Sequence, residues 1–513
     1  MRAFLGIDVG TSAVKVIALA ESGEIVAAAS EPLTLMQPAE GFSEQDPDEW
    51  WKQTGVAARA VVARCRARGM SIAAVGLSGQ MHGLVALDRD RIGTPGDGGA
   101  VRPCILWNDQ RSVVECDELE RLAGGAGPLV EATGNAAFPG FTLPKLLWMR
   151  RHEPERYARI GMVLLPKDFV RWRLTGDFAT DVGDACGTSL FDPAQRVWNE
   201  ALVAAAGIQR GWLPTAFESG APTGVVLPDV AAAWGLDAGT IVAAGSGDNM
   251  AGAVGAGVVS VGDCLIALGS SGVVLSPTAE CRSDTGVAGH IGRTHTMCHA
   301  DGDAKRRGSW CITGCTLSAG FALQWAHDSL WPESEYALLF AEANSSPAGC
   351  DGLVFLPQLM GERCPFRDPL ARGAWIGLSA RHTRGHLVRA ILEGVTFTLC
   401  EILRIQRELG ANPTTVRVGG GGARSPLWRQ ILADVTGLPV VTTNSEDGPA
   451  LGAAMLGGVA AEVWPSVGAA AAEIIVETGR TEPAAKTGVE NVYAAAQERL
   501  AAAQASLARL WRS

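Results

Sequence analysis

The stretch IDVGTSAV at residues 7–14 decides the fold of this chain, because it recurs about half a chain length later. Its counterpart is IALGSSGV at residues 266–273, in which Gly269 aligns with Gly10. Each copy places a small polar turn between two apolar segments, and this is the pattern of a β-hairpin. The repetition predicts two halves that open with the same strand–turn–strand element.

Length and composition agree with two domains. The 513 residues exceed what one hydrophobic core usually supports, and 47% hydrophobic residues suffice to fill two cores. The 63 glycines favour a sheet-rich enzyme with many tight turns over a helical bundle. We therefore expect an α/β protein with a first domain over residues 1–256 and a second over residues 257–513.

The net charge and the cysteine pattern limit the expected binding partners and cellular compartment. A formal charge of −11 disfavours a nucleic-acid partner, which needs a basic surface. The longest apolar region, residues 450–472, is interrupted by Glu462 and Pro465, so no membrane partner is expected. Twelve cysteines without a Cys-x-x-Cys pair favour free thiols in a reducing cytoplasm. The oligomeric state stays open, with a homodimer as one candidate.

The two turns suit phosphate binding. Successive backbone N–H groups in a Gly/Ser/Thr turn point into one concavity, and hydroxyl groups add donors. One such hairpin is commonly structural, whereas two matched copies at domain starts favour a phosphate role. The copies differ at one position, because Asp8 aligns with Ala267. A carboxylate in only one copy predicts a single Mg²⁺ at Asp8.

Other nucleotide-binding motifs are missing from the sequence. It contains no Gly-Lys pair, which excludes a P-loop. A dinucleotide fingerprint fails because Met250 and Arg424 stand where its third glycine is needed. A dehydrogenase is therefore disfavoured.

Asp248 is the candidate general base. It follows a predicted strand at 241–244 and a Gly-Ser-Gly turn, and it precedes a predicted small-residue helix at 249–257. A carboxylate in that place stays open to substrate and can take the proton of an attacking hydroxyl group. The structural alternative is a helix N-cap, for which Asp is a favoured residue.

A glycine run in the second half is the candidate nucleotide loop. Gly420, Gly421 and Gly422 follow a predicted strand, and Ser425 with Pro426 predicts a capped helix directly after them. Glycines let a flat ring lie against the backbone, and a helix N-terminus favours phosphate. The alternative is a plain Gly-rich connection.

Glycines also occur along a predicted helix that begins near residue 448. Gly452, Gly457 and Gly458 each cost about 1 kcal/mol relative to alanine. Close packing against another helix would offset that cost, for example across a closing cleft between the domains, so a tight helix contact is expected.

Two segments of the first half carry candidate sugar ligands. Gln80, Met81 and His82 lie between two glycines and are flanked by predicted strands. Amide and imidazole groups offer the paired donors and acceptors that a polyol needs. Trp107 adds an aromatic face for a carbon skeleton, although a lone Trp or His is more often structural.

Together these motifs resemble the FGGY carbohydrate kinases over essentially the whole chain. Segments around Met81 and Trp107 resemble the members that act on D-xylulose, whereas glycerol-specific members typically carry Arg-Glu in place of Met81-His82. The matching segments are GIDVGTSAVK at 6–15, SGQMHGLVALD at 78–88, LWNDQR at 106–111, PKD at 166–168, AGSGDNMAGAVGAG at 244–257, LGSSG at 268–272, FLPQLMGERCP at 355–365 and GGGGARSPLWRQILADV at 419–435.

The resemblance implies an actin-like fold: two ribonuclease-H-like domains with ATP and sugar in the cleft between them. It implies that Asp248 is the catalytic base and that Asp8 is associated with Mg²⁺. The sugar contacts that it implies are Met81, His82, Asp248 and Asn249, beside the motif candidates Gln80 and Trp107. The nucleotide contacts that it implies are Gly269, Ser270 and the 420–425 loop, with Gly420, Gly421, Gly422 and Ser425. The further phosphate-binding candidates from the turns are Gly10, Thr11, Ser12, Lys15 and Ser271.

The reaction implied is transfer of a phosphoryl group from ATP to D-xylulose. The first alternative is a kinase for another ketose or polyol, such as ribulose or glycerol. A second alternative, of a different class, is a non-catalytic actin-like ATP-binding protein. The chain departs from the family pattern at Ser270 and Cys364, where threonine is usual, and segments 301–308 and 362–366 have no assigned role.

Overall fold

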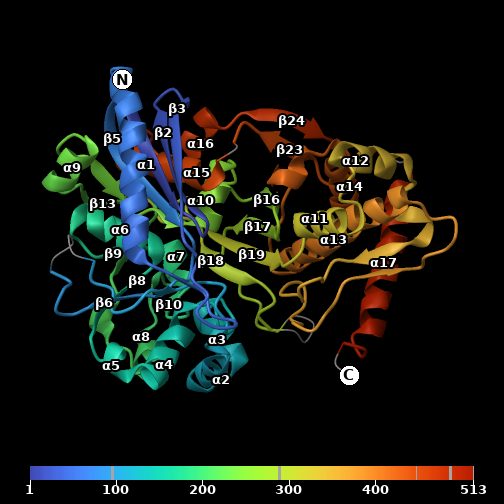
Figure 1. The fold of residues 1–513 in the computed structure, drawn as a ribbon, viewed down its shortest axis with the longest axis horizontal. Coiled ribbons are helices and arrows are strands. Elements are labelled where there is room, and N and C mark those ends of the chain that lie inside the picture. The colour runs from blue at the N-terminus through green and yellow to red at the C-terminus, as the bar shows by residue number, and fades with distance from the viewer. Residues whose placement is uncertain (94–97, 287–290, 446, 485–487, 512–513) are drawn as a thin grey trace. The chain divides into compact units, whose positions relative to one another are not determined.

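The computed structural model describes residues 1–93, 98–286, 291–445, 447–484 and 488–511, which form two compact units (Figure 1). No helix within these ranges is long and apolar enough to cross a membrane. A single division at residue 256 separates the two opening hairpins, but the units interleave along the chain. The first unit comprises Met1–Ser260, Thr278–Cys311 and Ser445–Val476, and the second comprises Val261–Pro277, Ile312–Asn444 and Glu477–Ser513.

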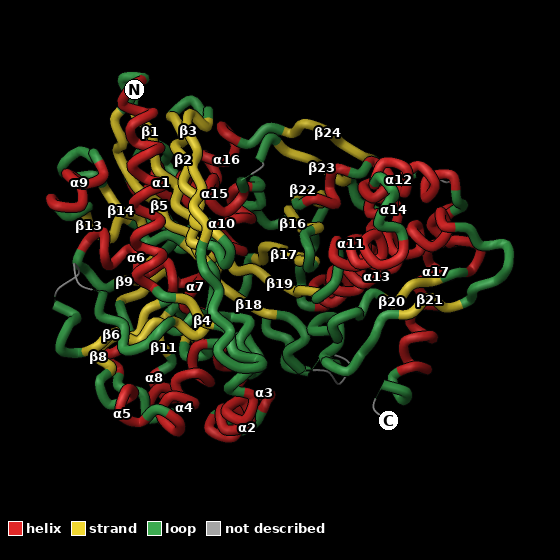
Figure 2. The backbone as a smooth tube through the Cα atoms, viewed as in Figure 1, coloured by secondary structure: helices red, strands yellow, loops and turns green. Residues whose placement is uncertain are grey.

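The first unit is built on a mixed sheet (Figure 2). Its strands lie in the order β13 (Pro222–Val225), β14 (Ile241–Ala243), β5 (Ser71–Gly79), β1 (Arg2–Val9), β2 (Ala13–Ala20) and β3 (Ile25–Pro32). β1 pairs antiparallel with β2 and parallel with β5, and β5 pairs parallel with β14. The predicted opening hairpin is therefore present and lies at the centre of this sheet.

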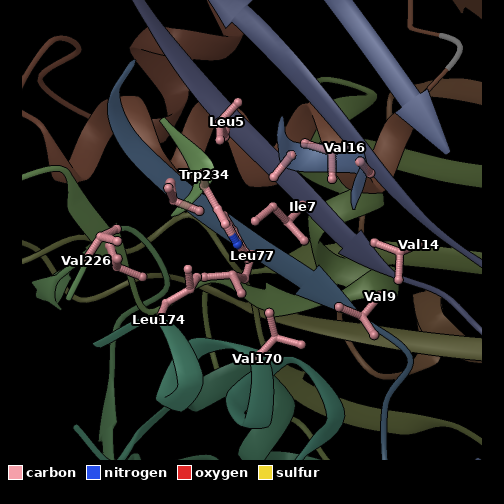
Figure 3. Packing of buried hydrophobic residues seen from close by; sticks show 14 of the residues in the cluster. Leu5, Ile7, Val9, Val14, Val16, Leu77, Val170, Leu174, Val226 and Trp234 are labelled. Carbon is pink, nitrogen blue, oxygen red and sulfur yellow. The ribbon is translucent and has the colours of Figure 1, made fainter. Parts of the chain in front are cut away.

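One face of this sheet carries a hydrophobic core. Leu5, Ile7 and Val9 alternate along β1, so their side chains point to the same face. Burying each such side chain stabilises the fold by about 1.5–3 kcal/mol. Figure 3 shows them among Val14, Val16, Leu77, Val170, Leu174, Val226 and Trp234, which come from the sheet, α6 (Pro166–Thr175), α9 (Pro228–Trp234) and the residues before α9. α1 (Pro47–Ala67) adds Trp50 and Val61 to the same core.

The other face of the sheet packs against α10 (Asp248–Gly255) and α15 (Gly448–Ala460). A Cβ at Gly6 would lie 1.9 Å from a carbonyl oxygen of α15, and one at Gly452 would lie 1.9 Å from a carbonyl oxygen of α10. The expected tight helix contact is therefore present. It joins α15 to elements of its own unit, which brings α10 and the start of α15 together.

Short paired strands and helices make up the rest of the first unit and carry the two candidate sugar segments. The pairs are β4 (Glu44–Gln45) with β7 (Cys104–Ile105), β6 (Val85–Asp88) with β8 (Ile160–Leu164), β9 (Ala179–Asp181) with β12 (Thr215–Phe217), and β10 (Phe191–Asp192) with β11 (Val197–Trp198). The remaining elements are α2 (Val113–Leu122), α3 (Ala126–Thr133), α4 (Thr142–His152), α5 (Pro154–Tyr157), α7 (Val182–Cys186), α8 (Glu200–Ala205), β15 (Ser246–Gly247), β18 (His295–Cys298) and α16 (Val467–Ile474).

The sheet of the second unit repeats the topology of the first. Its strands lie in the order β19 (Trp310–Thr316), β17 (Gly272–Thr278), β16 (Asp263–Leu268), β22 (Thr415–Gly419), β23 (Val440–Thr443) and β24 (Glu477–Thr481). β16 pairs antiparallel with β17 and parallel with β22, and β22 pairs parallel with β23. The duplication predicted from one turn thus extends to whole sheets.

Helices cover the sheet of the second unit. The longest, α13 (Arg384–Glu408), is largely buried and contributes Val388, Leu392 and Leu399 to a separate hydrophobic core. The other elements are α11 (Gly320–Leu330), α12 (Tyr336–Ser345), α14 (Pro426–Thr436), α17 (Val489–Leu507) and the paired strands β20 (Val354–Leu356) and β21 (Ala374–Ile376).

Candidate active site

Asp8 lies near the end of β1, directly opposite Lys15 of β2. Burial raises the pKa of its carboxyl group to about 6, although the nearby Ser78 hydroxyl group and the charge of Lys15 act in the opposite direction. Its Oδ1 atom is buried without a hydrogen-bond partner among the described residues. A buried carboxylate oxygen that lacks a donor is suited to a hard cation.

The surroundings of Asp8 fit Mg²⁺ rather than a metal caged by protein. The described residues contain no group of three or more His, Cys, Asp or Glu side chains that could hold a metal. Mg²⁺ commonly uses one or two carboxylates, with water and substrate phosphates completing its shell. A single orphaned carboxylate oxygen meets that requirement.

Asp248 is the first residue of α10, directly after β15. The N-cap position belongs to Gly247, and no side chain caps this helix, so the N-cap interpretation of Asp248 is wrong by one residue. Burial raises the pKa of the Asp248 carboxyl group to about 7, and the negative charge of Asp8 adds to the shift. A carboxyl group with a pKa near 7 is matched to accepting a proton at neutral pH.

Met81 and Asn249 lie next to Asp248. A Cβ at Gly247 would lie 2.6 Å from Cγ of Met81, so glycine at this position leaves room for the methionine. Asn249 Nδ2 donates to Met81 Sδ over 3.7 Å. The structure therefore brings two predicted sugar ligands to the candidate base.

The position of His82 is defined by its backbone conformation, one hydrogen bond and one stacked aromatic ring. Its φ of +68° lies in the left-handed region, which costs a non-glycine residue about 1 kcal/mol or more. Its Nδ1 lies 2.9 Å from the carbonyl oxygen of Gly187, and its ring stacks on Phe141 with centroids 4.1 Å apart. Because a carbonyl only accepts, Nδ1 carries the hydrogen, and the neutral ring then has its acceptor at Nε2.

Gln80 connects the first turn to the sugar segment. It is buried, and its Nε2 donates to Oε1 of Gln45 over 2.8 Å and to the carbonyl of Gly10 over 3.3 Å. Thr11 Oγ1 donates to Gln80 Oε1 and accepts from Trp107 Nε1 over 3.0 Å. Trp107 is 37% exposed, so it is not a core residue. Direct sugar contacts of Gln80 and Trp107 stay predictions.

The remaining residues of the first hairpin have separate places. The N–H group of Gly10 closes the hairpin by donating to the carbonyl of Ala13 over 3.1 Å, and Ser12 lies exposed at the tip. Lys15 forms an ion pair with Asp447, which directly precedes α15. Phosphate contacts of this hairpin stay a prediction.

A buried charged cluster adjoins the turn that precedes Asp248. Lys167 Nζ lies 2.5 Å from Asp168, 2.9 Å from Asp181 and 3.5 Å from Asp184. Burial, chiefly, holds the pKa of Asp184 well above its usual value, and the charge of Asp248 contributes. The single ammonium group of Lys167 thus contacts three buried carboxyl groups near the candidate base.

In the second unit, the turn between β16 and β17 is fixed by two neighbouring segments. The carbonyl oxygens of Gly269 and Ser270 accept from N–H groups at the start of α11 over 2.7 and 2.8 Å. Gly420 has a φ of +82°, and a Cβ there would lie 2.6 Å from the carbonyl oxygen of Leu268. The predicted nucleotide loop therefore passes over the end of β16. Ser271 lies with Gly269 and Ser270 in the turn between β16 and β17.

The other loop residues divide into packed and open positions. A Cβ at Gly422 would meet Trp428 at 2.9 Å, whereas one at Gly421 would meet nothing within 4 Å. Ser425 accepts from the N–H group of Trp428 over 3.3 Å, which confirms the predicted N-cap of α14. The open side of Gly421 leaves space for a flat ring.

Several supporting residues were not singled out from the sequence. Gln45, Phe141 and Asp447 lie far along the chain from the groups that they contact. For the buried cluster around Lys167, the local signal was PKD at 166–168 with two further aspartates at 181 and 184. Pairing them required the fold.

Comparisons with known proteins agree with this architecture. Residues 3–255 match the N-terminal domain of the FGGY family of carbohydrate kinases, and residues 264–461 match its C-terminal domain. The chain is 42% identical to xylulose kinase of Escherichia coli (strain K12), over 89% of this chain and 90% of that protein. It is 38% identical to xylulose kinase of Bacillus subtilis (strain 168), over 95% and 94% of the two chains.

The fold agrees with a solved structure as well. A crystal structure of a "xyloylose kinase" from Brucella ovis superposes with a TM-score of 0.89 at 35% identity, covering 99% of this chain and 100% of that one. The predicted two-domain α/β fold is confirmed. The chain therefore belongs to the FGGY family of carbohydrate kinases, and it is a carbohydrate kinase.

Proposed function

We propose that this kinase transfers the γ-phosphoryl group of ATP to the terminal hydroxyl group of D-xylulose, giving ADP and D-xylulose 5-phosphate. The hydroxyl proton passes to Asp248, the sugar oxygen bonds to phosphorus, and the bond from phosphorus to the ADP oxygen breaks. Relatives at 42% and 38% identity are xylulose kinases, which supports this sugar. The raised pKa of Asp248 carries the assignment of the base.

The groups around Asp248 support an uncharged, polyhydroxylated substrate. Met81 offers an apolar, polarisable surface beside Asn249, whose amide both donates and accepts. His82 has its hydrogen on Nδ1, which makes Nε2 the accepting nitrogen of a neutral ring. None of these three side chains offers a fixed positive charge for an acidic sugar.

ATP and Mg²⁺ are assigned to the Gly/Ser/Thr turns, Lys15, the 420–425 loop and Asp8. Mg²⁺ neutralises charge on the phosphates when it is bound, and Asp8 is its proposed protein ligand. The backbone N–H groups of the turns and the N-terminus of α14 would orient phosphate oxygens. We place the reaction in the cytoplasm, in keeping with twelve free cysteines.

A coupled assay of ADP release tests the substrate. We expect D-xylulose to have the highest kcat/KM, D-ribulose a lower one and glycerol a much lower one. A hydroxyl group of the wrong configuration leaves a buried partner unpaired, which corresponds to about 5–150-fold in kcat/KM. His82→Ala should reduce the preference between the two ketoses as well as the affinity.

Two outcomes would change the proposal in different ways. If D-ribulose or glycerol is the best substrate, the D-xylulose assignment is wrong while the kinase activity stands. If ATP binds but no ketose or polyol in the panel is phosphorylated, the proposed transfer reaction itself is wrong.

A further inference from the structure

Lys145 on α4 is a fully buried lysine whose partners are backbone carbonyl groups. Its Nζ donates to the carbonyl oxygen of His82 over 2.9 Å and to that of Ile105 over 3.1 Å. Among the described residues no carboxylate lies within ion-pair distance of Lys145. A buried ammonium without a paired carboxylate is unusual, because desolvation of the charge is costly.

The two carbonyl groups belong to the two candidate sugar segments. His82 follows Met81, and Ile105 comes two residues before Trp107. Ile105 also accepts from the N–H group of Leu84 over 3.0 Å, so the segments already lie side by side. Lys145 therefore joins both segments through a single nitrogen.

A second side chain of α4 supports the same carbonyl group. Thr142 Oγ1 donates to the carbonyl oxygen of His82 over 3.0 Å, so this oxygen accepts from both Thr142 and Lys145. The residue held in this way has the left-handed φ of +68° and donates from its ring to Gly187. Two donors thus converge on the backbone of the one sugar-segment residue with an uncommon conformation.

The buried surroundings of Lys145 favour a role in positioning other residues over a role in stabilising the fold. Burial, chiefly, lowers the pKa of Lys145 to about 7 and the charge of Arg111 lowers it further, whereas nearby Asp109 raises it. A neutral amine has two N–H donors and an ammonium has three, so both carbonyl bonds persist in either protonation state. An apolar side chain of similar size would fill this space without the cost of burying an amine.

We propose that Lys145 is a positioning residue for the sugar site, which with Thr142 fixes the backbone of His82 and ties it to the Trp107 segment. This inference rests on the proposed sugar site. It concerns the orientation of the His82 ring and its acceptor, and Lys145 itself touches no substrate.

Steady-state kinetics separate positioning from general destabilisation. We expect Lys145→Met to raise the KM for D-xylulose about tenfold or more while the KM for ATP changes less than about twofold. Thr142→Val should raise the sugar KM in the same direction by a smaller factor. Thr142→Val replaces one hydroxyl group with a methyl group of similar size, so this variant tests the proposal if Lys145→Met does not fold.

Arg171→Met is the matched control. Arg171 is another buried cation of the first unit that donates to backbone carbonyl groups, here those of Asp177 and Thr223. This variant should lower the melting temperature and leave the sugar KM unchanged. An unchanged sugar KM in both α4 variants, or an equal rise in Arg171→Met, would overturn the proposal.

A second measurement does not depend on activity. In protein labelled with ¹⁵N-histidine, the ring signals of His82 are assigned by their loss in His82→Gln. The wild type should show the hydrogen on Nδ1, Lys145→Met and Thr142→Val should alter these signals, and Arg171→Met should not. Unchanged His82 signals in both α4 variants refute the positioning role, even if the wild type phosphorylates no ketose and the proposed function itself is wrong.

Discussion

The two hairpins that open the two halves share a topology but differ in their surroundings. The first, between β1 and β2, has Asp8 on its strand, an ion pair from Lys15 to Asp447, and side-chain bonds from Gln80, Gln45 and Trp107 to its turn. In the second, between β16 and β17, Ala267 takes the place of Asp8. Its turn is held by backbone bonds from the start of α11.

The difference shows how a duplicated element can acquire two tasks. Backbone bonds leave the second turn as a set of N–H groups and hydroxyls, which suits an anion and needs no titratable group. Side-chain bonds couple the first turn to Gln80 and Trp107 in the candidate sugar segments, and Asp8 raises the pKa of the Asp248 carboxyl group. The asymmetry therefore predicts that the metal ligand, Asp8, and the base that it influences, Asp248, have no counterparts at the second hairpin.

The largest expected effect is the loss of turnover in Asp248→Asn. Asparagine has nearly the same size and the helix does not depend on this residue as its N-cap, but an amide cannot accept the proton. The kcat should fall by roughly 10²–10⁴. Steady-state assays together with thermal unfolding check this.

Glu490→Gln is the control for that variant, since Glu490 is an exposed acid in the first turn of α17 in the second unit. It should keep wild-type turnover. More than about a tenth of wild-type kcat in Asp248→Asn would contradict the role of general base, because that corresponds to less than ~1.4 kcal/mol of barrier.

Asp8→Asn tests the asymmetry between the hairpins directly. Loss of even an outer-shell partner typically costs about 10–100-fold in metal affinity, so loss of this ligand's charge should raise the Mg²⁺ concentration for half-maximal activity by roughly tenfold or more. Sugar binding measured without nucleotide should be largely kept. The matched control is Ala267→Ser at the aligned position of the second hairpin, which should leave the Mg²⁺ titration unchanged. Equal shifts in the two variants would show that the asymmetry has no functional meaning.

Sequence reasoning succeeded where the information was local. A polar turn between apolar strands at residues 10–12 and 269–271 predicted both hairpins, and Ser425 before Pro426 predicted the cap of α14. These features depend on neighbouring residues, whose preferences act before any long-range contact forms. The structural alternative for Asp248, an N-cap, does not hold because α10 already begins at this residue.

Sequence reasoning failed where the site depends on contacts between residues that are far apart in the sequence. Lys15 meets Asp447 from 432 positions away, and Lys145 meets His82 from 63 positions away. No local preference encodes such pairs. The same limit explains why the packing of α15 on the first sheet, through glycines such as Gly6, was not predicted.

A smaller effect is expected in the pH dependence of stability. Burial raises the pKa of Asp248 to about 7 and that of Asp8 to about 6, so each group favours folding in its protonated form. That contribution is complete below the unfolded pKa near 3.8 and is lost as the pH rises through the folded value.

Asp248→Asn and Asp8→Asn should therefore gain melting temperature relative to the wild type as the pH rises from about 4 to about 8. Thermal unfolding in EDTA measures this without metal. Ala267→Ser, which has no titratable group, should show a constant difference from the wild type. If the melting temperature of the two Asn variants instead falls relative to the wild type as the pH rises, these carboxyl groups are ionised and stabilised in the folded protein.

The smallest effects are expected in the nucleotide loop of the second unit, where adjacent glycines should respond oppositely. Gly420→Ala places a side chain at a φ of +82° and close to the Leu268 carbonyl oxygen, so it should cost ~1–2 kcal/mol or more of stability. Gly421→Ala meets no protein atom within 4 Å, so stability should change by less than ~1 kcal/mol. If a flat ring lies against Gly421, the KM for ATP should rise a few-fold in Gly421→Ala while the KM for the sugar stays constant. An unchanged ATP KM there would place the ring elsewhere and leave packing over β16 as the reason for the glycine run.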